Sequence, residues 1–157
     1  MDLSPQAIGA RLLRTRWIVR APIGLFRVGL GWLFVGRILL LEHRGRVSGA
    51  RRFVCLEVVE RPARDRIVIV SGFGVGAQWY RNLQAHPECV VSVSAIRRAS
   101  AVARFLADDE AEQVIARYQV AHPGAWDALR TTIERAVGHP VQRLPMVELT
   151  LTSGVLP

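Results

Sequence analysis

Apolar positions recur along the chain with two different spacings, which separate the expected helices from the expected strands. Residues 6–37 place leucine, tryptophan and phenylalanine at helical spacing between arginines, and Pro22 is expected to divide this segment into two helices. Short runs rich in β-branched residues predict strands at 38–42, 53–59, 67–71, 89–93, 99–105 and 146–152. Further helices are predicted at 78–85, 108–118 and 126–137.

The order of these elements determines the expected fold class. Two pairs of strands, at 38–42 with 53–59 and at 89–93 with 99–105, follow one another across short turns and predict hairpins. Hairpins favour an α+β fold in which about six mainly antiparallel strands form a barrel with flanking helices. A length of 157 residues fits one domain, so residues 1–157 are expected to fold together, with 1–37 as an N-terminal amphipathic helical segment.

Charge is concentrated at the N-terminal end of the chain. Residues 1–52 contain ten arginines but only Asp2 and Glu42 as acids, which accounts for the whole net charge of +8. Basic and acidic residues balance in 53–157, and the chain has no lysine. Such a local excess predicts an anionic partner near this region: a phosphorylated cofactor, a lipid surface or nucleic acid.

Several classes of protein are disfavoured by what the sequence lacks. No apolar run reaches the length of a membrane-spanning helix, and arginines interrupt any candidate signal peptide, so we expect a cytoplasmic protein. Cys55 and Cys89 form no CxxC motif and are expected to be buried free thiols. The histidines are scattered, which predicts solvated or capping roles and no metal site: His43, His86, His122 and His139. Motifs of serine hydrolases, P-loop enzymes and dinucleotide-binding domains are absent.

The candidate chemistry lies in two glycine-containing loops and an aromatic pair. Residues 44–52 read RGRVSGARR, 71–74 read SGFG, and 79–83 read WYRNL. Taken alone, the first is an ordinary solvated turn and the aromatic pair is core packing. Taken together, freed backbone amides, a serine hydroxyl and several guanidinium groups within nine residues are what a phosphate or carboxylate needs. We therefore interpret residues 44–52 as an anion-binding loop.

These motifs resemble the nitroreductase family of deazaflavin-dependent oxidoreductases. The resemblance extends from about residue 17 to about residue 151 and follows the succession Gly45-Arg46-x-Ser48-Gly49, Ser71-Gly72, Trp79-Tyr80-x-Asn82-Leu83, Ala85-His86-Pro87. It implies a split β-barrel that binds coenzyme F420, an 8-hydroxy-5-deazaflavin. The coenzyme's phosphate and oligoglutamate tail would lie on the basic loop, and its ring would lie in a groove against the strands.

The resemblance also implies roles for individual residues. Arg46, Ser48, Gly49 and Arg52 would hold the phosphate region. Ser71 and Gly72 would approach the ring through backbone groups, while Trp79 and Asn82 would flank the site. Val47 and Gly72 stand where some family members carry lysines, and we expect Arg44 and Arg51 to compensate for the missing charge. Tyr80 and Tyr118 are weak candidates for a proton donor, with water as an equal alternative.

The function implied is transfer of hydride from the reduced coenzyme to a quinone, a nitro compound or another small, hydrophobic, activated acceptor. Phe73 and Trp126 are expected to wall its pocket. A flavin-loaded barrel is one alternative. Another is a lipid- or fatty-acid-binding or cofactor-carrier protein without turnover, whose segment 1–37 contacts an anionic membrane. Nucleic-acid binding is disfavoured because the arginines lack an aromatic stacking pattern. The oligomeric state is not predicted.

Overall fold

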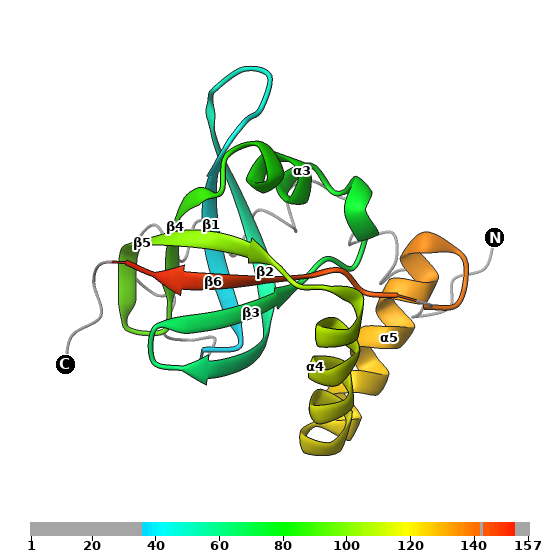
Figure 1. Cartoon of the computed structure of the whole chain (residues 1–157). Helices are drawn as coiled ribbons and strands as arrows, with labels where there is room; N and C mark the ends of the chain where they lie inside the picture. The colour runs from blue at the N-terminus through cyan, green and yellow to red at the C-terminus, as the bar shows by residue number, and fades with distance from the viewer. Residues whose placement is uncertain (1–35, 142, 153–157) are drawn as a thin grey trace, which may run out of the picture.

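The computed structural model describes residues 36–141 and 143–152 (Figure 1). The predicted N-terminal helices therefore lie outside the described residues, apart from the last two positions of the segment. No helix in the described ranges is both long and apolar enough to cross a membrane.

Six described strands close into a barrel in which every neighbouring pair is antiparallel. The strand order around the barrel is β1-β2-β3-β6-β5-β4, so β6 lies between β3 and β5, and β4 closes on β1. The strands are β1 (Ile38–Arg44), β2 (Arg51–Ala63), β3 (Arg66–Val70), β4 (Glu88–Val93), β5 (Ile96–Phe105) and β6 (Met146–Leu151). The prediction of about six mainly antiparallel strands is confirmed.

The barrel interior is filled by alternate residues of the strands. On β1, Leu39 and Leu41 are fully buried, in phase with each other, and pair in register with Leu56 and Val54 of β2. Because successive side chains of a strand point to opposite faces, this period of two places one apolar row inside the barrel. We call the buried residues of this interior, which include Ile69, the barrel core.

The helices cover one end and one side of the barrel. Figure 1 shows α3 over the end from which the β1–β2 loop projects, while α4 and α5 lie together beside the barrel. A second buried cluster, which includes Val70, Val114 and Ile133, forms where α4 and α5 pack on β2 and β3. The helical elements are η2 (Gly74–Gly76), α3 (Gln78–Ala85), α4 (Asp108–Ala121) and α5 (Pro123–Val137).

Most of the strands, together with α4 and α5, have bounds other than the predicted ones, and three differences from the prediction have a local reason. Strand β2 continues through Pro62, beyond the predicted end at residue 59, because register shifts after Val58 and Glu60 make the strand irregular there. Helix α5 begins at Pro123 instead of at residue 126, since proline is tolerated at the first helical position. Residues Gly74–Gly76, for which no helix or strand was predicted, form a short 3₁₀ helix, η2.

Both cysteines carry free thiols, as predicted, but only Cys89 is fully buried. Cys55 is half-buried on β2. Burial raises the pKa of each thiol to about 12. Neither is therefore ionised near neutral pH, which gives both a packing role.

Candidate active site

The β1–β2 loop is a tight turn built around two glycines. Gly45 donates its N–H to the carbonyl of Ala50, and Gly49 donates to the carbonyl of Gly45, each at 2.8 Å. A Cβ at Gly45 would lie 2.8 Å from Ser48 Oγ, and Gly49 has a φ of +68°, a conformation that favours glycine. Ser48 Oγ accepts the Ala50 N–H at 3.2 Å. The glycines predicted from sequence thus shape the loop directly.

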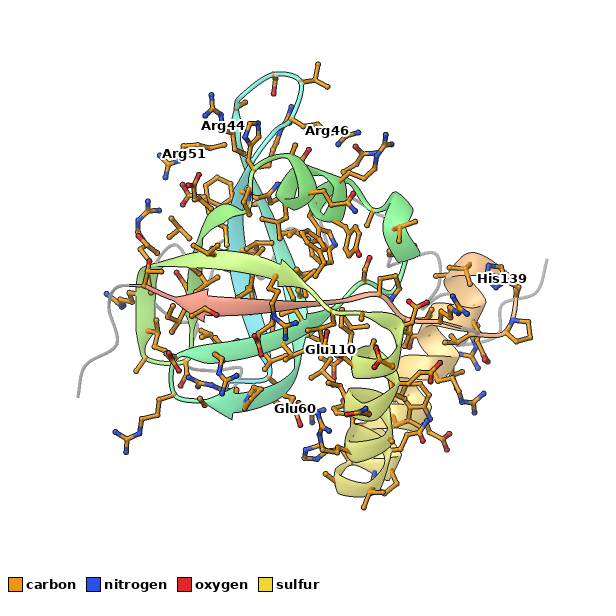
Figure 2. All side chains as sticks on the ribbon, in the orientation of Figure 1. Arg44, Arg46, Arg51, Glu60, Glu110 and His139 are labelled. Carbon is orange, nitrogen blue, oxygen red and sulfur yellow. The ribbon has the colours of Figure 1, made fainter. Side chains whose placement is uncertain are left out.

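Three arginines at this loop and its base have no acidic partner among the described residues. Within the described part of the chain, no carboxylate forms an ion pair with Arg44, Arg46 or Arg52. Figure 2 shows Arg44 and Arg51 on one side of the loop base and Arg46 on the other, above α3. Three uncompensated guanidinium groups on one loop favour an anion at this position.

Arg51 does not supply the compensating charge expected of it. Its Nε lies 2.6 Å from Glu42 Oε1, and Arg98 Nη1 lies 2.7 Å from Glu42 Oε2, so both arginines share that carboxylate. Val47, where some family members carry a lysine, is 92% exposed at the loop tip. The charge available to an anion therefore comes from Arg44, together with Arg46 and Arg52.

A buried hydrogen-bond chain ties the loop to α3 and β1. Asn82 Oδ1 accepts from the backbone N–H of Arg46 at 3.1 Å and from Arg46 Nη1 at 2.9 Å. Asn82 Nδ2 lies 3.1 Å from His43 Nδ1. The side chains of Asn82 and His43 are both buried. Burial, and then the guanidinium of Arg52 on the facing strand, lower the pKa of His43 from 6.5 to about 4, so the imidazole is neutral at pH 7.

Residues 71–74, which follow β3, are held by hydrogen bonds inside the protein. Ser71 is fully buried; its hydroxyl donates to the carbonyl of Gly74 at 2.6 Å and its N–H donates to the carbonyl of Pro145 at 2.9 Å. Both donors of Ser71 are therefore used inside the protein. Gly72 approaches α5 so closely that a Cβ there would lie 3.1 Å from Ile133 Cγ1. These two residues shape the turn that leads to η2.

The aromatic pair at the start of α3 is largely enclosed. Trp79 and Tyr80 are 7% and 6% exposed, belong to the barrel core and meet edge to face with ring centroids 5.7 Å apart. Tyr80 also meets Phe105 edge to face at 4.9 Å. Burial, and then the negative charge of Asp108, raise the pKa of Tyr80. The packing interpretation of this pair therefore has direct support from the structure.

Tyr118, a residue of α4, lies in the second cluster rather than in the barrel core that contains Tyr80. Its hydroxyl donates to Glu57 Oε1 at 2.7 Å. Burial and then this carboxylate raise the pKa of Tyr118 to about 12. The structure does not bring the two candidate tyrosines together, and each holds its proton more firmly than a free tyrosine.

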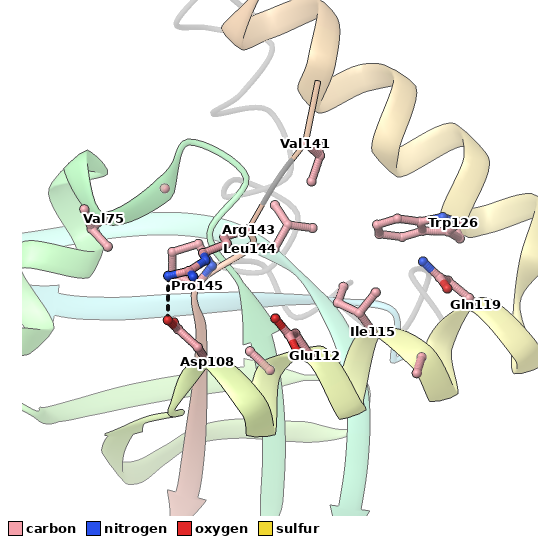
Figure 3. A pocket seen from close by; sticks show the side chains of 13 residues that line it. Val75, Asp108, Glu112, Ile115, Gln119, Trp126, Val141, Arg143, Leu144 and Pro145 are labelled. Carbon is pink, nitrogen blue, oxygen red and sulfur yellow. Dashed lines mark hydrogen bonds and ion pairs between the residues drawn. The ribbon is translucent and has the colours of Figure 1, made fainter. Parts of the chain in front are cut away.

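An apolar pocket of about 520 Å³ lies between η2, α4, α5 and the residues before β6 (Figure 3). Its walls are mostly aliphatic and aromatic, with Trp126 on the α5 side as predicted. Phe73 is not among the lining residues and is 67% exposed. At the mouth, Arg143 Nη1 and Asp108 Oδ2 form an ion pair at 2.7 Å. The polar lining residues are Asp108, Glu112, Gln119 and Arg143.

One short stretch of chain connects the pocket to the arginine loop. Gly74 and Val75 line the pocket, and eight residues after Gly74 the side chain of Asn82 holds Arg46. The residues 71–82 thus border an apolar pocket with one part and a basic loop with another. This arrangement offers one surface to an anionic group and another to an apolar one.

The model of the F420H(2)-dependent quinone reductase family matches residues 17–142. The chain belongs to this family. A Mycobacterium tuberculosis protein that bears the same family name is 36% identical over 74 residues, which cover 46% of this chain and 61% of that protein's length. The match to this quinone reductase family confirms the resemblance inferred from the loop motifs.

Solved structures of other proteins have the same fold as this chain. An F420-H2-dependent reductase (FDR-A) superposes with a TM-score of 0.51 at 23% identity, covering 72% of this chain and 93% of that one. HutZ, the heme storage protein of Vibrio cholerae, superposes with a TM-score of 0.51 at 18% identity, covering 87% and 92%. Likeness at this level of identity shows the fold alone, which is the predicted split β-barrel.

His43 is the site residue that the sequence interpretation missed, because it was expected to be solvated or to cap a helix. It is 6% exposed. The signal was present: His43 follows Leu39 and Leu41 at a spacing of two, which places it in the row that faces the barrel interior. His86 and His122 do cap helices, at the C-terminal ends of α3 and α4.

Proposed function

We propose that this protein is an F420H2-dependent reductase that delivers hydride to a quinone, a nitro compound or a similar activated acceptor. The observation that carries this proposal is the glycine-built loop with three uncompensated arginines, which residues 71–82 connect to an apolar pocket, in a chain of this family. Coenzyme F420 combines a planar ring with an anionic tail. The guanidinium donors of the loop fit the anionic tail, and the apolar pocket fits a hydrophobic acceptor that must meet the ring.

The basic loop would hold the phosphate region of the coenzyme. Arg46, bound to Asn82 through Nη1, keeps its other guanidinium N–H groups for an anion, and Arg52 and Arg44 add further charge. Ser48 and Gly49 shape the turn. Trp79 would support the site from within the barrel core, and Ser71 and Gly72 would set the shape of the wall.

When bound, the reduced deazaflavin supplies a hydride from its C5 atom. The chain's task is to hold the acceptor against that position and to exclude water during transfer. The pocket lined by Trp126 is the proposed place for a small hydrophobic acceptor. Because Tyr118 already donates to Glu57 and the pKa of Tyr80 is raised, we assign the proton that completes the reduction to water.

Titration of the protein with oxidised coenzyme F420, followed by tryptophan fluorescence, tests the binding site. Arg46→Ala and Arg52→Ala are each expected to weaken binding about tenfold or more, since a hydrogen bond to a charged group contributes about 1.5–3 kcal/mol. Arg64→Ala is the matched control, because Arg64 lies at the β2–β3 turn and the variant loses the same charge. Equal binding by all four proteins would show that the loop is not the coenzyme site.

Turnover is tested separately with menadione, a soluble quinone. Reduced coenzyme F420 is expected to be oxidised as menadione is consumed, while NADPH, NADH and reduced FMN are expected to support no reaction. The chain has no dinucleotide-binding fingerprint for the nicotinamide coenzymes. Coenzyme binding without turnover on quinone, nitroaromatic and enone acceptors would favour the alternative of a carrier or lipid-binding protein.

We further propose that residues 1–157 form one domain, with segment 1–37 packed on the barrel. Co-sedimentation with anionic and neutral lipid vesicles tests the alternative. No sedimentation with either is expected. Salt-sensitive binding to the anionic vesicles only would instead assign the N-terminal arginines to a membrane surface.

A further inference from the structure

The chain from Arg46 through Asn82 to His43 has only one consistent set of hydrogen-bond directions. The backbone N–H and the guanidinium of Arg46 can only donate, so the atom of Asn82 that faces them must be the amide oxygen. The Asn82 amide nitrogen, a donor, therefore faces His43 Nδ1. Nδ1 must accept, which places the imidazole proton on Nε2.

In its Nε2–H tautomer, His43 favours one of two orientations of the Asn82 amide. Rotation of the amide by half a turn would set its NH2 group against both donors of Arg46 and its oxygen against the Nδ1 lone pair of His43. Both ends of that arrangement repel, and a move of the imidazole proton to Nδ1 would relieve only the His43 end. With both side chains buried, water is not at hand to satisfy the rotated form.

Two features of His43 keep it in the accepting state. It is enclosed at the end of the barrel, in the interior row of β1, and the facing residue on β2 is Arg52. A second proton would place a cation beside that guanidinium and would turn Nδ1 into a donor aimed at another donor. Neutral His43 is therefore the form that fits the chain of hydrogen bonds.

We propose that His43 is a positioning residue for the coenzyme's phosphate region, acting through Asn82 on Arg46. By fixing the amide, it holds the Arg46 backbone and one edge of the guanidinium, and so presets the remaining guanidinium N–H groups for the anion. A preset side chain loses less rotamer freedom on binding, so the gain appears as affinity. This inference rests on the proposed function.

The first test needs no coenzyme. Long-range ¹H–¹⁵N NMR of the imidazole at pH 7 reports which nitrogen carries the proton. The proton is expected on Nε2 of His43. A proton on Nδ1 would overturn the proposal, because Nδ1 could then not accept from Asn82.

The second test is a double-mutant cycle on binding of oxidised coenzyme F420. His43→Leu removes the acceptor and is expected to weaken binding about fivefold or more, a loss of the size of one hydrogen bond. His43→Asn, whose Oδ1 can replace Nδ1 as acceptor, is expected to stay within about twofold of wild type. In the Arg46→Ala background, His43→Leu is expected to have no further effect, because the two residues act in series.

Two results would overturn the positioning role: wild-type affinity in His43→Leu, or an equal loss from His43→Leu with and without Arg46. If His43→Leu does not fold, Asn82→Asp replaces it. A carboxylate only accepts, so His43 is then expected to move its proton to Nδ1, and an unchanged tautomer would contradict the chain. If the wild-type protein does not bind coenzyme F420, the proposed function fails, and the tautomer still decides whether the network exists.

Discussion

Replacement of Tyr118 by phenylalanine separates a structural tyrosine from a catalytic one. The hydroxyl of Tyr118, on α4, donates to Glu57 Oε1, on β2, at 2.7 Å, in the second cluster and away from the arginine loop. Phenylalanine keeps the buried ring, so the variant creates no large cavity. We therefore expect Tyr118→Phe to lower the free energy of unfolding without changing coenzyme affinity or turnover.

The size of the loss in unfolding free energy depends on the acceptor of this hydrogen bond, the carboxylate of Glu57. Hydrogen bonds to charged groups contribute about 1.5–3 kcal/mol. Glu57 remains 27% exposed in the side chain and keeps Arg37 at 3.6 Å, so its carboxylate is still partly satisfied when the hydroxyl is gone. The expected loss lies at the lower end, about 1.5 kcal/mol, which corresponds to a fall in Tm of roughly 3–6 °C for a chain of this length.

Urea denaturation measures the free energy directly, with an unchanged m-value expected because the same surface is exposed on unfolding. Glu57→Gln is the control, since its amide oxygen still accepts from Tyr118 while the charge is lost. If Tyr118→Phe instead lowered turnover tenfold with stability intact, Tyr118 would be the proton donor. The assignment of that proton to water would then be wrong.

Three further predictions concern the pH response, the α5 contact and the pocket. The pKa of His43 is about 4 in the folded protein and 6.5 in the unfolded chain, so the unfolded chain takes up the proton first as pH falls. The free energy of unfolding should therefore decline between pH 6.5 and pH 4. Urea denaturation should show this decline to be larger in wild type than in His43→Asn, by up to roughly 3 kcal/mol. An equal decline in the two proteins would remove His43 from the explanation. Gly72→Ala should cost about 1–2 kcal/mol, because its Cβ would press on buried Ile133, and Ile133→Val in the same chain should restore part of the loss in thermal denaturation. Trp126→Ala should raise the KM for menadione roughly fivefold or more while leaving coenzyme affinity unchanged. Weaker coenzyme binding with an unchanged KM for menadione would instead place the ring of the coenzyme, not the acceptor, against Trp126.

Most of the barrel could be predicted from sequence because its strands carry their signals locally. Helix α3 has the predicted bounds, and His86-Pro87 marks its end in the sequence because the residue before a proline avoids helical dihedrals. Strand β2 was predicted too short because Pro62 is normally a sign of a turn. The irregular pairing that admits it depends on β3 and cannot be read from β2 alone.

The site was predictable in its residue types but not in its contacts. Glycine and arginine in one turn indicated an anion loop, and the loop has the expected tight form. The sequence could not show that Arg51 is held by Glu42 and Arg98, because Arg98 lies 47 positions further along the chain. Likewise, the role of Asn82 depends on His43 and Arg46, which only the closed barrel brings to it.

The position of β6 makes the order of synthesis matter for this fold. Until residues 146–151 leave the ribosome, β3 and β5 each present an open edge, because β6 is the strand that joins them. The carbonyl of Pro145, which fixes Ser71, and the Leu144 wall of the pocket arrive with the same strand. The residues of the β1–β2 hairpin are therefore complete in the nascent chain well before the pocket can form, and the edges of β3 and β5 stay open to pairing with another chain until β6 is inserted.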